Sequence, residues 1–381
     1  MSWEKVKLID CCVSIADGDH QPPPKSDSGI PFVTIANIVN NQFDFKNSMF
    51  VPESYYEKLD YKRKAKKNDI LYSVVGSFGI PVFIKDDKPF VFQRHIAILR
   101  PNKKVNARFL YYKMLSRNFY MKADAAAIGA AQRTVSLTSL RNIEIIVPPM
   151  ETQRRIADVL SAYDDLIENN RKQIKLLEEA AQRLYKEWFV NLRFPGHEHT
   201  KIVDGVPEGW DRMPVGSLIG KVDRTKQIPT SEYLPNGKIP VIDQSREFIA
   251  GYTNDVQAIV KSKAPIIVFG DHTRILKLVQ FPFAKGADGT QLIISASERM
   301  PQRLLYCSLM NIDLSNYHYA RHFKYLKSEI ILLPSKGIAD DFEKITDPVF
   351  KKIQSCRDQC CWGQEARDRL LPKLMSGEVE V

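Results

Sequence analysis

A dense run of basic residues is the part of this 381-residue sequence best suited to binding another molecule. Five of the six residues from 62 to 67 are Lys or Arg, and Tyr61 directly precedes them. Such side chains can neutralise the phosphates of a nucleic acid, although a run of charge is more often a solvated surface. The chain carries 55 Lys and Arg against 45 Asp and Glu, a net charge of +10, which favours a polyanionic partner without identifying one.

Catalytic motifs are not evident. The sequence contains no GxxxxGK(S/T) loop, no GxGxxG that opens a helix, no HExxH and no GxSxG. Gly76–Gly79 has the composition of a hairpin corner rather than of a phosphate-binding loop. Asp69 and Asp86 resemble only faintly the acidic pair of a metal-dependent nuclease, because residues 86–89 have the composition of a turn. We therefore predict a protein without a catalytic centre or a metal site.

Cysteine usage and hydropathy indicate a cytoplasmic protein. No CxxC pair and no histidine at ligand spacing accompany the cysteines, so reduced thiols fit best. No apolar stretch approaches the roughly 18 residues of a membrane-spanning helix, and no apolar signal segment opens the chain. The six cysteines are Cys11, Cys12, Cys307, Cys356, Cys360 and Cys361.

Four short segments recur in the same order in the two halves of the chain, which indicates an internal duplication. Their offset is 207 and 209 residues for the first two pairs and falls to 196 and 186 for the last two, so the two related units have different middles. Within the first unit, short strands are expected at 70–75, 81–84, 90–92 and 96–99, followed by one helix at about 107–127. The recurring pairs are Trp3–Val6 with Trp210–Met213, Ile30–Val33 with Ile239–Ile242, Leu71–Ser73 with Ile267–Phe269, and Leu140–Pro148 with Leu326–Pro334.

A long helix is predicted after each unit. Residues 151–190 contain neither Gly nor Pro, and their apolar residues recur at alternating steps of four and three, which is the spacing of a coiled-coil seam. The seam spans roughly 50 Å, and a compact linker at 191–208 would make the two helices antiparallel. An extended linker could reach roughly 60 Å, so the residues alone also permit a parallel pair. The first seam comprises Ile156, Leu160, Tyr163, Ile167, Asn170, Ile174, Leu177, Ala181, Leu184 and Trp188.

Most of this seam recurs in the second helix, where Cys356 and Cys360 are interpreted as small apolar seam residues. Gly363 and Arg367 depart from the pattern, and Pro372 predicts a frayed or kinked end. Asn170, a lone polar seam residue, is expected to fix the register. The apolar or small seam residues of the second helix are Phe342, Val349, Ile353, Cys356, Cys360, Leu370 and Leu374, with Thr346 among them.

Specific motifs in the helical segments resemble a known family. Val147–Ile156 (VPPMETQRRI), Asp164–Asn170 (DDLIENN) and Leu184–Gly196 resemble the central conserved region of specificity (S) subunits of type I restriction-modification systems. Arg369–Glu378 (RLLPKLMSGE) is similar to the distal region of the same family. The resemblance covers the whole chain, whereas the globular parts are generic.

The resemblance implies an α/β (α+β) fold with two target recognition domains in pseudo-twofold repeat, separated by an antiparallel two-helix coiled coil. Each domain would read one half of a bipartite DNA site, and the helices would set the spacer and dock the methyltransferase subunits. The unequal middles predict an asymmetric site. The implied boundaries are 1–149 for the first recognition domain, 150–192 for the central helix, 193–335 for the linker and second domain, and 336–381 for the C-terminal helix.

The resemblance also implies the partners. They are double-stranded DNA, two methyltransferase (M) subunits, and restriction (R) subunits that join through the M2S complex in a prokaryotic cytoplasm. The S subunit itself is non-catalytic and needs no cofactor, whereas S-adenosylmethionine, Mg and ATP belong to the partner subunits of an adenine-specific methyltransferase and ATP-dependent endonuclease.

Basic and amide side chains in the two units are the candidates for DNA contacts, because they suit phosphates and base edges. An ordinary solvated charge is an equally good interpretation of each one. The candidates of the first unit are Lys62, Arg63, Lys64, Lys66, Lys67, Arg94, Gln132 and Arg133. Those of the second unit are Arg246, Arg274, Lys277, Arg321, His322 and Lys324.

Two other classes of protein remain possible from the sequence. One is a stand-alone basic DNA-binding protein or a coiled-coil adaptor without restriction partners. The other is a nuclease, which would require metal-dependent cleavage that involves Asp69 or Asp86.

Overall fold

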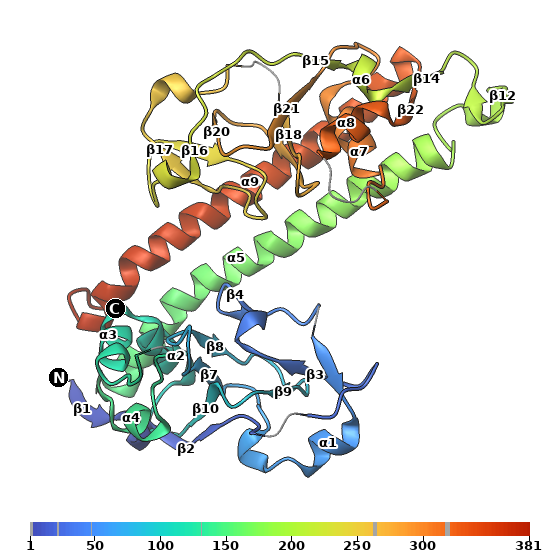
Figure 1. Ribbon diagram of the computed structural model, residues 1–381. Helices are drawn as coiled ribbons and strands as arrows, with labels where there is room; N and C mark the ends of the chain where they lie inside the picture. The colour runs from blue at the N-terminus through green and yellow to red at the C-terminus, as the bar shows by residue number, and fades with distance from the viewer. Residues whose placement is uncertain (1–2, 21–22, 47, 131, 262–264, 317–320) are drawn as a thin grey trace. The chain divides into compact units, whose positions relative to one another are not determined.

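The chain forms two compact units, each with a globular part and segments of two long helices. The computed structural model describes residues 3–20, 23–46, 48–130, 132–261, 265–316 and 321–381 (Figure 1). Unit 1 contains Met1–Glu168 and Cys360–Val381, and unit 2 contains Asn169–Gln359. The long helices α5 (Met150–Tyr185) and α9 (Lys336–Ser376) therefore each contribute to both units.

Unit 1 is built on a four-stranded sheet with the order β2-β10-β7-β8 and a three-stranded sheet with the order β6-β3-β9. The pair β3 and β9 is parallel, whereas the four-stranded sheet is antiparallel. A separate antiparallel pair joins β1 to β11. The strands are β1 (Glu4–Lys7), β2 (Cys12–Asp17), β3 (Ile30–Val33), β4 (Ile38–Val39), β5 (Gln42–Phe43), β6 (Met49–Val51), β7 (Ile70–Ser73), β8 (Pro81–Phe83), β9 (Val91–Phe92), β10 (Ile96–Pro101) and β11 (Glu144–Val147).

The central sheet of unit 1 is buried on both faces. Successive residues of a strand point to opposite faces, so Ile70 and Tyr72 of β7 join one apolar cluster and Leu71 joins another. In β10, Ala97 and Ile98 divide between the clusters in the same way. This explains why the predicted strands appear in the sequence as continuous apolar runs rather than as alternating patterns.

Unit 2 repeats the main sheets of unit 1, whereas the antiparallel pair of β4 and β5 in unit 1 has no counterpart among the described strands of unit 2. Its sheets have the orders β15-β21-β18-β19 and β17-β16-β20, again with one parallel pair, β16 with β20. A separate pair joins β14 to β22, as β1 pairs with β11. The strands are β14 (Asp211–Pro214), β15 (Ile219–Gly220), β16 (Ile239–Ile242), β17 (Gly251–Thr253), β18 (Ile266–Gly270), β19 (Leu276–Val279), β20 (Ala284–Lys285), β21 (Thr290–Ser295) and β22 (Ile330–Leu333).

The four recurring sequence segments lie at equivalent places in the two topologies, which confirms the duplication. They form β1 and β14, β3 and β16, β7 and β18, and β11 and β22. Equivalence holds to the residue at the strand pair that closes each unit, where Glu4 faces Val147 and Asp211 faces Leu333. The predicted linker contains a short hairpin of β12 (Ile202–Val203) and β13 (Val206–Pro207).

The helix expected at 107–127 is instead two helices. Ser116 has extended backbone angles, and its hydroxyl accepts a hydrogen bond from the Phe119 N–H, so it ends the first helix and caps the second. In unit 2 the described residues of the equivalent region form one helix before α8 (His322–Ser328). The short helices are α1 (Glu53–Lys58), α2 (Ala107–Leu115), α3 (Arg117–Ala125) and α4 (Leu137–Asn142) in unit 1, and α6 (Val215–Leu218), α7 (Gln302–Met310) and α8 (His322–Ser328) in unit 2.

The two long helices form as predicted, and α5 ends in the π-helical turn Lys186–Val190. The second helix was expected to be frayed or kinked at Pro372, and the fraying is wrong, because α9 continues to Ser376. Leu371 and Leu374 flank Pro372 and are buried in the core of unit 1, and this packing offsets the loss of one backbone N–H donor.

The helices are antiparallel within each unit. In unit 1, Asp164 pairs with Arg367 at 2.6 Å, whereas Ile167, further along α5, accepts a hydrogen bond from Cys360, earlier in α9. In unit 2, Asn170 donates to Gln359, whereas Glu178, further along α5, lies 2.7 Å from the guanidinium of Arg357, earlier in α9. The fold expected from the sequence, α/β units with an antiparallel helix pair, is thereby confirmed.

Candidate nucleic-acid interface

The basic run 62–67 lies on the surface of unit 1 but is not a uniform patch. Asp60 caps the short 3₁₀ helix η3 (Tyr61–Arg63) by accepting from the Lys62 N–H at 2.7 Å. The side chains of Lys62, Lys66 and Lys67 are exposed. Lys64 is half-buried, because its ammonium donates to the Glu57 carbonyl at 2.8 Å. The Lys62 ammonium lies 5.8 Å from the Tyr61 ring centroid. Three of the five basic side chains can therefore reach a phosphate without breaking a hydrogen bond or an ion pair of the described residues.

Arg63 lies among acidic residues that the sequence analysis did not single out. Its guanidinium is 3.7 Å from Asp17 and 3.9 Å from Asp19. Asp17 also contacts the His20 ring at 2.5 Å, and Asp19 accepts a hydrogen bond from the Tyr55 hydroxyl. Burial and this hydrogen bond raise the pKa of Tyr55 to about 12, so Tyr55 stays a neutral donor at physiological pH.

Arg94 lies next to the same cluster. It follows the parallel strand β9, and its N–H donates to the Asp19 carbonyl at 2.9 Å. Its side chain is exposed, and its guanidinium has no hydrogen bond or ion pair within the described residues. Arg63 and Arg94, distant in sequence, thus both contact Asp19, the first through its guanidinium and the second through its backbone N–H.

Gln132 and Arg133 lie in a different part of unit 1, against the turn that joins β7 to β8. The Arg133 carbonyl accepts from the Gly76 N–H at 2.9 Å, and the Arg133 guanidinium lies 5.7 Å from the Phe78 ring centroid. This guanidinium also binds Asp124 at 2.6 Å. Arg133 therefore holds the loop in place, whereas the Gln132 side chain is exposed.

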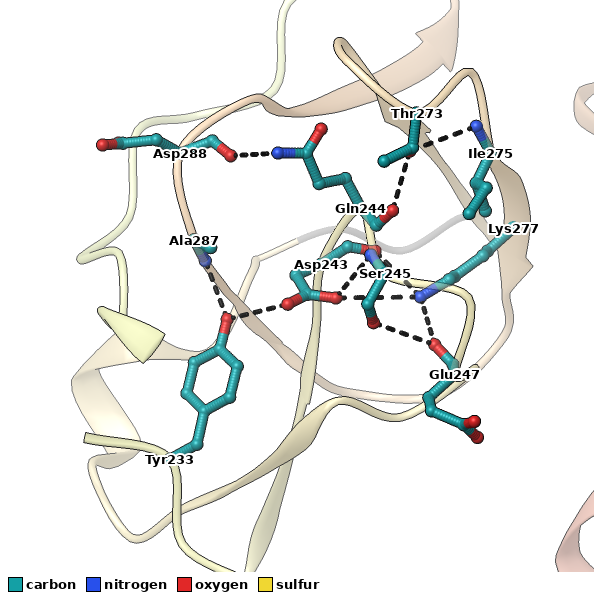
Figure 2. A network of polar contacts seen from close by, with 10 residues as sticks. All are labelled: Tyr233, Asp243, Gln244, Ser245, Glu247, Thr273, Ile275, Lys277, Ala287 and Asp288. Atoms are coloured by element: carbon teal, nitrogen blue, oxygen red, sulfur yellow. Dashed lines mark hydrogen bonds and ion pairs between the residues drawn. The ribbon is translucent and has the colours of Figure 1, made fainter. Parts of the chain in front are cut away.

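In unit 2 a polar network ties together segments that are far apart along the chain, as Figure 2 shows. Gln244, just after β16, donates from its amide to the Asp288 carbonyl at 2.8 Å and accepts from the His272 N–H at 3.1 Å. Thr273 donates to the Gln244 carbonyl at 2.7 Å. The network fixes loop 243–247, on which the side chain of Arg246 is exposed and has no partner among the described residues.

Lys277 is the buried centre of this network, which corrects its proposed role as a DNA contact. Its side chain is 4% exposed, and its ammonium donates to the carbonyls of Asp243, at 2.8 Å, and Glu247. Burial lowers the pKa of Lys277 to about 8, an effect that the Asp243 carboxylate partly offsets. A lysine whose donors are bonded to backbone carbonyls positions the loop and cannot reach a phosphate.

The other candidates of unit 2 gather near the turn between β18 and β19. Arg274 has a positive φ of 61° and donates to the Leu314 carbonyl at 3.0 Å, so it supports the turn. His322 is buried, its N–H donates to the Asp271 carbonyl at 3.0 Å, and burial lowers its pKa, so its interpretation as a surface contact is also wrong. Arg321 and Lys324 are exposed beside it.

The seam residues lie on the buried or half-buried side of the helices. Asn170, 2% exposed, is among them and donates to the Gln359 side chain at 3.0 Å. Buried seam residues are Ile156, Leu160, Ile167, Asn170, Ala181, Trp188, Phe342, Thr346, Ile353, Cys356, Cys360 and Leu374. Half-buried seam residues are Tyr163, Ile174, Leu177, Leu184, Val349 and Leu370.

The two departures from the seam pattern have specific partners within unit 1. Gly363 is buried, and a Cβ atom there would lie 3.3 Å from Ile167, so glycine permits the close approach of the helices. Arg367 forms its ion pair with Asp164 at 2.6 Å. Both residues therefore belong to the helix contact rather than interrupting it.

The acidic residues considered for metal binding do not converge. Asp69 is 3% exposed and accepts two hydrogen bonds from the Arg100 guanidinium, at 2.8 and 3.1 Å. Asp86 lies in an exposed turn beside Lys88. Over the described part of the chain, no three His, Cys, Asp or Glu side chains are grouped to hold a metal ion. The Asp69 carboxylate thus neutralises an arginine.

Among the residues that the structure describes, no helix is both long and apolar enough to cross a lipid bilayer.

Sequence reasoning missed Asp17, Asp19, Tyr55 and Gln244. Each is a common polar residue in a segment without a motif, and its partner lies elsewhere in the sequence. Asp19, for example, is far from Tyr55 along the chain. A weak signal was available only for Gln244, which lies two residues after the recurring segment that forms β16.

The fold and its surface define a duplicated α/β protein with exposed basic residues on each unit. Residues 2–179 match the family model described as "Type I restriction modification DNA specificity domain". These residues therefore belong to that family of domains. The resemblance of the chain to type I specificity subunits, drawn above from its helical motifs, is thereby confirmed.

Similarity to individual proteins extends over the whole chain. The type I restriction enzyme MjaIX specificity subunit of Methanocaldococcus jannaschii is 26% identical over 413 residues, which cover 100% of this chain and 94% of that protein. The putative MjaX specificity subunit of the same organism is 29% identical over 67% of this chain and 62% of its own length. The crystal structure of a type I S subunit from M. genitalium has the same fold, with a TM-score of 0.62 at 18% identity over 98% of this chain and 96% of that one.

Proposed function

We propose that this chain is the sequence-specific DNA recognition subunit of a type I restriction-modification complex. The observation that carries the proposal is the duplication: one strand topology is built twice, in a chain that is similar from end to end to specificity subunits. Two related units suit a bipartite site, because each can read one half. Their different polar clusters favour two different half-sites and hence an asymmetric site.

Two kinds of DNA contact are expected from the two units, one to phosphates and one to base edges. Lys62, Lys66 and Lys67 of unit 1, and Arg321 and Lys324 of unit 2, are exposed and would contact phosphates, which supplies affinity but no sequence information. Base edges would be read by side chains that the fold holds in place. The buried Lys277 is a positioning residue, because it fixes the loop that carries Arg246.

The helix pair would set the spacer between the half-sites. A seam of roughly 50 Å corresponds to about 15 base pairs of B-DNA, so half-sites one to two turns apart would suit it. The same helices would dock the methyltransferase subunits, two per specificity subunit, and restriction subunits would join that complex.

The chemistry would belong to the partners. In this proposal the chain needs no cofactor of its own, and S-adenosylmethionine, Mg and ATP act in the methyltransferase and restriction subunits. Because an adenine must leave the base stack to be methylated, the specificity subunit would hold the flanking duplex during that step. The relatives are archaeal and bacterial proteins, which supports a cytoplasmic location in a prokaryotic cell.

Mapping of methylated adenines in the genome of the host tests this function. We expect two short, different half-sites at a fixed separation, and loss of the methylation when the gene is deleted. A perfect palindrome would contradict the asymmetry. Methylation that is unchanged by deletion, with no methyltransferase gene nearby, would instead favour a stand-alone DNA-binding or adaptor protein.

A further inference from the structure

Arg63 of unit 1 has a guanidinium group that two carboxylates attract, although none of its hydrogen-bond donors is used among the described residues. The Arg63 side chain is 33% exposed, and its nitrogens lie 3.7 Å from Asp17 and 3.9 Å from Asp19. These separations give electrostatic attraction but are too long for hydrogen bonds. Among the described residues the guanidinium makes no hydrogen bond at all. Its N–H groups are therefore available to an external acceptor.

The carboxylate beside Arg63 is itself anchored to the sheet. Asp19 is 8% exposed, its N–H donates to the Phe92 carbonyl at 2.9 Å, and its carbonyl accepts from the Arg94 N–H at 2.9 Å. The Tyr55 hydroxyl donates to its carboxylate. The carboxylate thus has a fixed position, and it restrains the guanidinium that it attracts.

Two carboxylates next to one guanidinium also determine what the group can bind. Their two negative charges outweigh its single positive charge and would repel a phosphate, so Arg63 is a poor phosphate contact. A guanine edge in the major groove is uncharged and offers two acceptors, O6 and N7, which match the fork of an arginine. The local charge therefore favours a base over the DNA backbone.

Neighbouring cations lack this combination. Arg100 and Arg133 give their donors to Asp69 and Asp124. Lys277 in unit 2 belongs to a comparable group, in which Tyr233 donates to Asp243 at 3.1 Å, but its ammonium is buried and bonded to carbonyls. Arg94 is exposed without an ion pair to restrain it.

We propose that Arg63 is a specificity-determining residue that reads a guanine in the half-site of unit 1, with Asp17 and Asp19 holding its guanidinium in the reading position. The proposal rests on the proposed DNA recognition function and names one base that unit 1 selects. Lys62, adjacent in sequence but exposed and without a carboxylate partner in the described residues, serves as a phosphate contact.

Selection from a pool of random duplexes tests the proposal. The full-length chain is purified with the subunits that accompany it in the cell, as wild type and as the variants Arg63→Gln, Arg63→Lys and Lys62→Gln. We expect Arg63→Gln to lose the preference for guanine at one position of one half-site, by about ten- to a hundredfold, with all other positions unchanged. Arg63→Lys keeps the charge but loses the fork, so it loses part of the same preference.

The control variants separate base reading from phosphate binding. Lys62→Gln should keep every base preference, bind all sequences more weakly, and lower the slope of log affinity against log salt by about 1. Arg246→Gln of unit 2 should leave the half-site affected by Arg63 intact. Thermal unfolding of each variant shows whether it is folded, and if Arg63→Gln does not fold, Arg63→Lys decides.

Three results would contradict either the role of Arg63 or the proposed function. If both Arg63 variants keep every base preference, Arg63 does not read a base, and the proposed function stands. The same conclusion follows if Arg63→Gln lowers the salt slope as Lys62→Gln does without changing any preference. If the wild-type protein selects no sequence at all, the proposed function itself is wrong.

Discussion

The Asn170 amide donates a hydrogen bond of 3.0 Å to the side-chain oxygen of Gln359, which joins α5 to α9 within unit 2. Asn170 is 2% exposed and lies in an otherwise apolar seam. Apolar side chains can pack in several registers at similar free energy, whereas a buried amide needs its partner opposite. The sequence expectation that Asn170 fixes the register of the helix pair thus acquires a named partner.

Replacing Asn170 should destabilise unit 2. Asn170→Ala leaves the Gln359 oxygen without its donor, so we expect its free energy of unfolding to fall by about 1–3 kcal/mol in urea denaturation. A double-mutant cycle with Gln359→Ala should give a coupling energy of roughly 0.5–1.5 kcal/mol. A coupling energy near zero would show that the two amides do not depend on each other.

Gly363 should tolerate no large side chain. Its Cβ position lies 3.3 Å from Ile167, so Gly363→Leu would force α5 and α9 apart in unit 1 and cost about 1–3 kcal/mol. Gly337 provides a matched control in the same helix, because nothing lies within 4 Å of its Cβ position. Gly337→Ala should be neutral or stabilising, since alanine is the better helix former. Equal melting temperatures for both variants would refute the close packing.

Lys113 should make the stability of unit 1 depend on pH. It is 5% exposed and donates to the Met375 carbonyl at 3.1 Å, near the end of α9. Burial, with a smaller contribution from Lys122, lowers its pKa to about 8 from the ordinary 10.5. Between these two values the unfolded chain holds a proton that the folded unit has released, so folded stability rises as pH increases.

The variant Lys113→Met lacks this dependence. From pH 7.5 to 9.5 the free energy of unfolding should shift in favour of wild type relative to Lys113→Met, by at most about 3 kcal/mol, because each unit of pKa difference is worth ~1.4 kcal/mol. Lys277→Met should remove the same kind of pH dependence from unit 2, because burial also lowers the pKa of Lys277 to about 8. A constant difference across this range would mean that Lys113 stays protonated throughout.

Substitution of Asp69 should destabilise the protein more than substitution of Asp86, and neither residue should be needed for catalysis. Asp69→Ala leaves the Arg100 guanidinium without its bidentate partner and should cost roughly 3 kcal/mol, whereas Asp86→Ala in its exposed turn should change little. The purified chain should show no metal-dependent DNA cleavage in either case. Cleavage that disappeared with one of these substitutions would instead establish a nuclease.

Lengthening both helices tests the proposed spacer role. An insertion of one heptad in each of α5 and α9 adds about 10 Å, so methylation mapping should show the same half-sites separated by about three more base pairs. An insertion in α5 alone is the control, because it mismatches the seam and should impair folding. An altered half-site at the original separation would contradict the role of the helices.

Local sequence determined the elements of this protein. The apolar runs predicted the positions of β7, β8, β9 and β10, and the alternating seam predicted α5 and most of α9. The recurring segments were sufficient to predict the duplication, since equivalent strands need similar residues to cover similar cores. The break at Ser116 was missed because a single capping serine is a weak signal inside a helical segment.

Only the tertiary structure decided which charged side chains are available to a ligand such as DNA. From the sequence Arg63, Lys277 and His322 were equivalent candidates, yet Lys277 and His322 are buried and Arg63 stands between two carboxylates. Likewise, the sequence alone places Gly363 and Arg367 outside the seam pattern. In the structure Ile167 lies opposite Gly363, and Asp164 pairs with Arg367. Helix and strand periodicity depend on neighbouring residues and can be read along the chain. The exposure and partners of a polar group depend on residues that only folding brings together, because burial is favourable only where a partner is present.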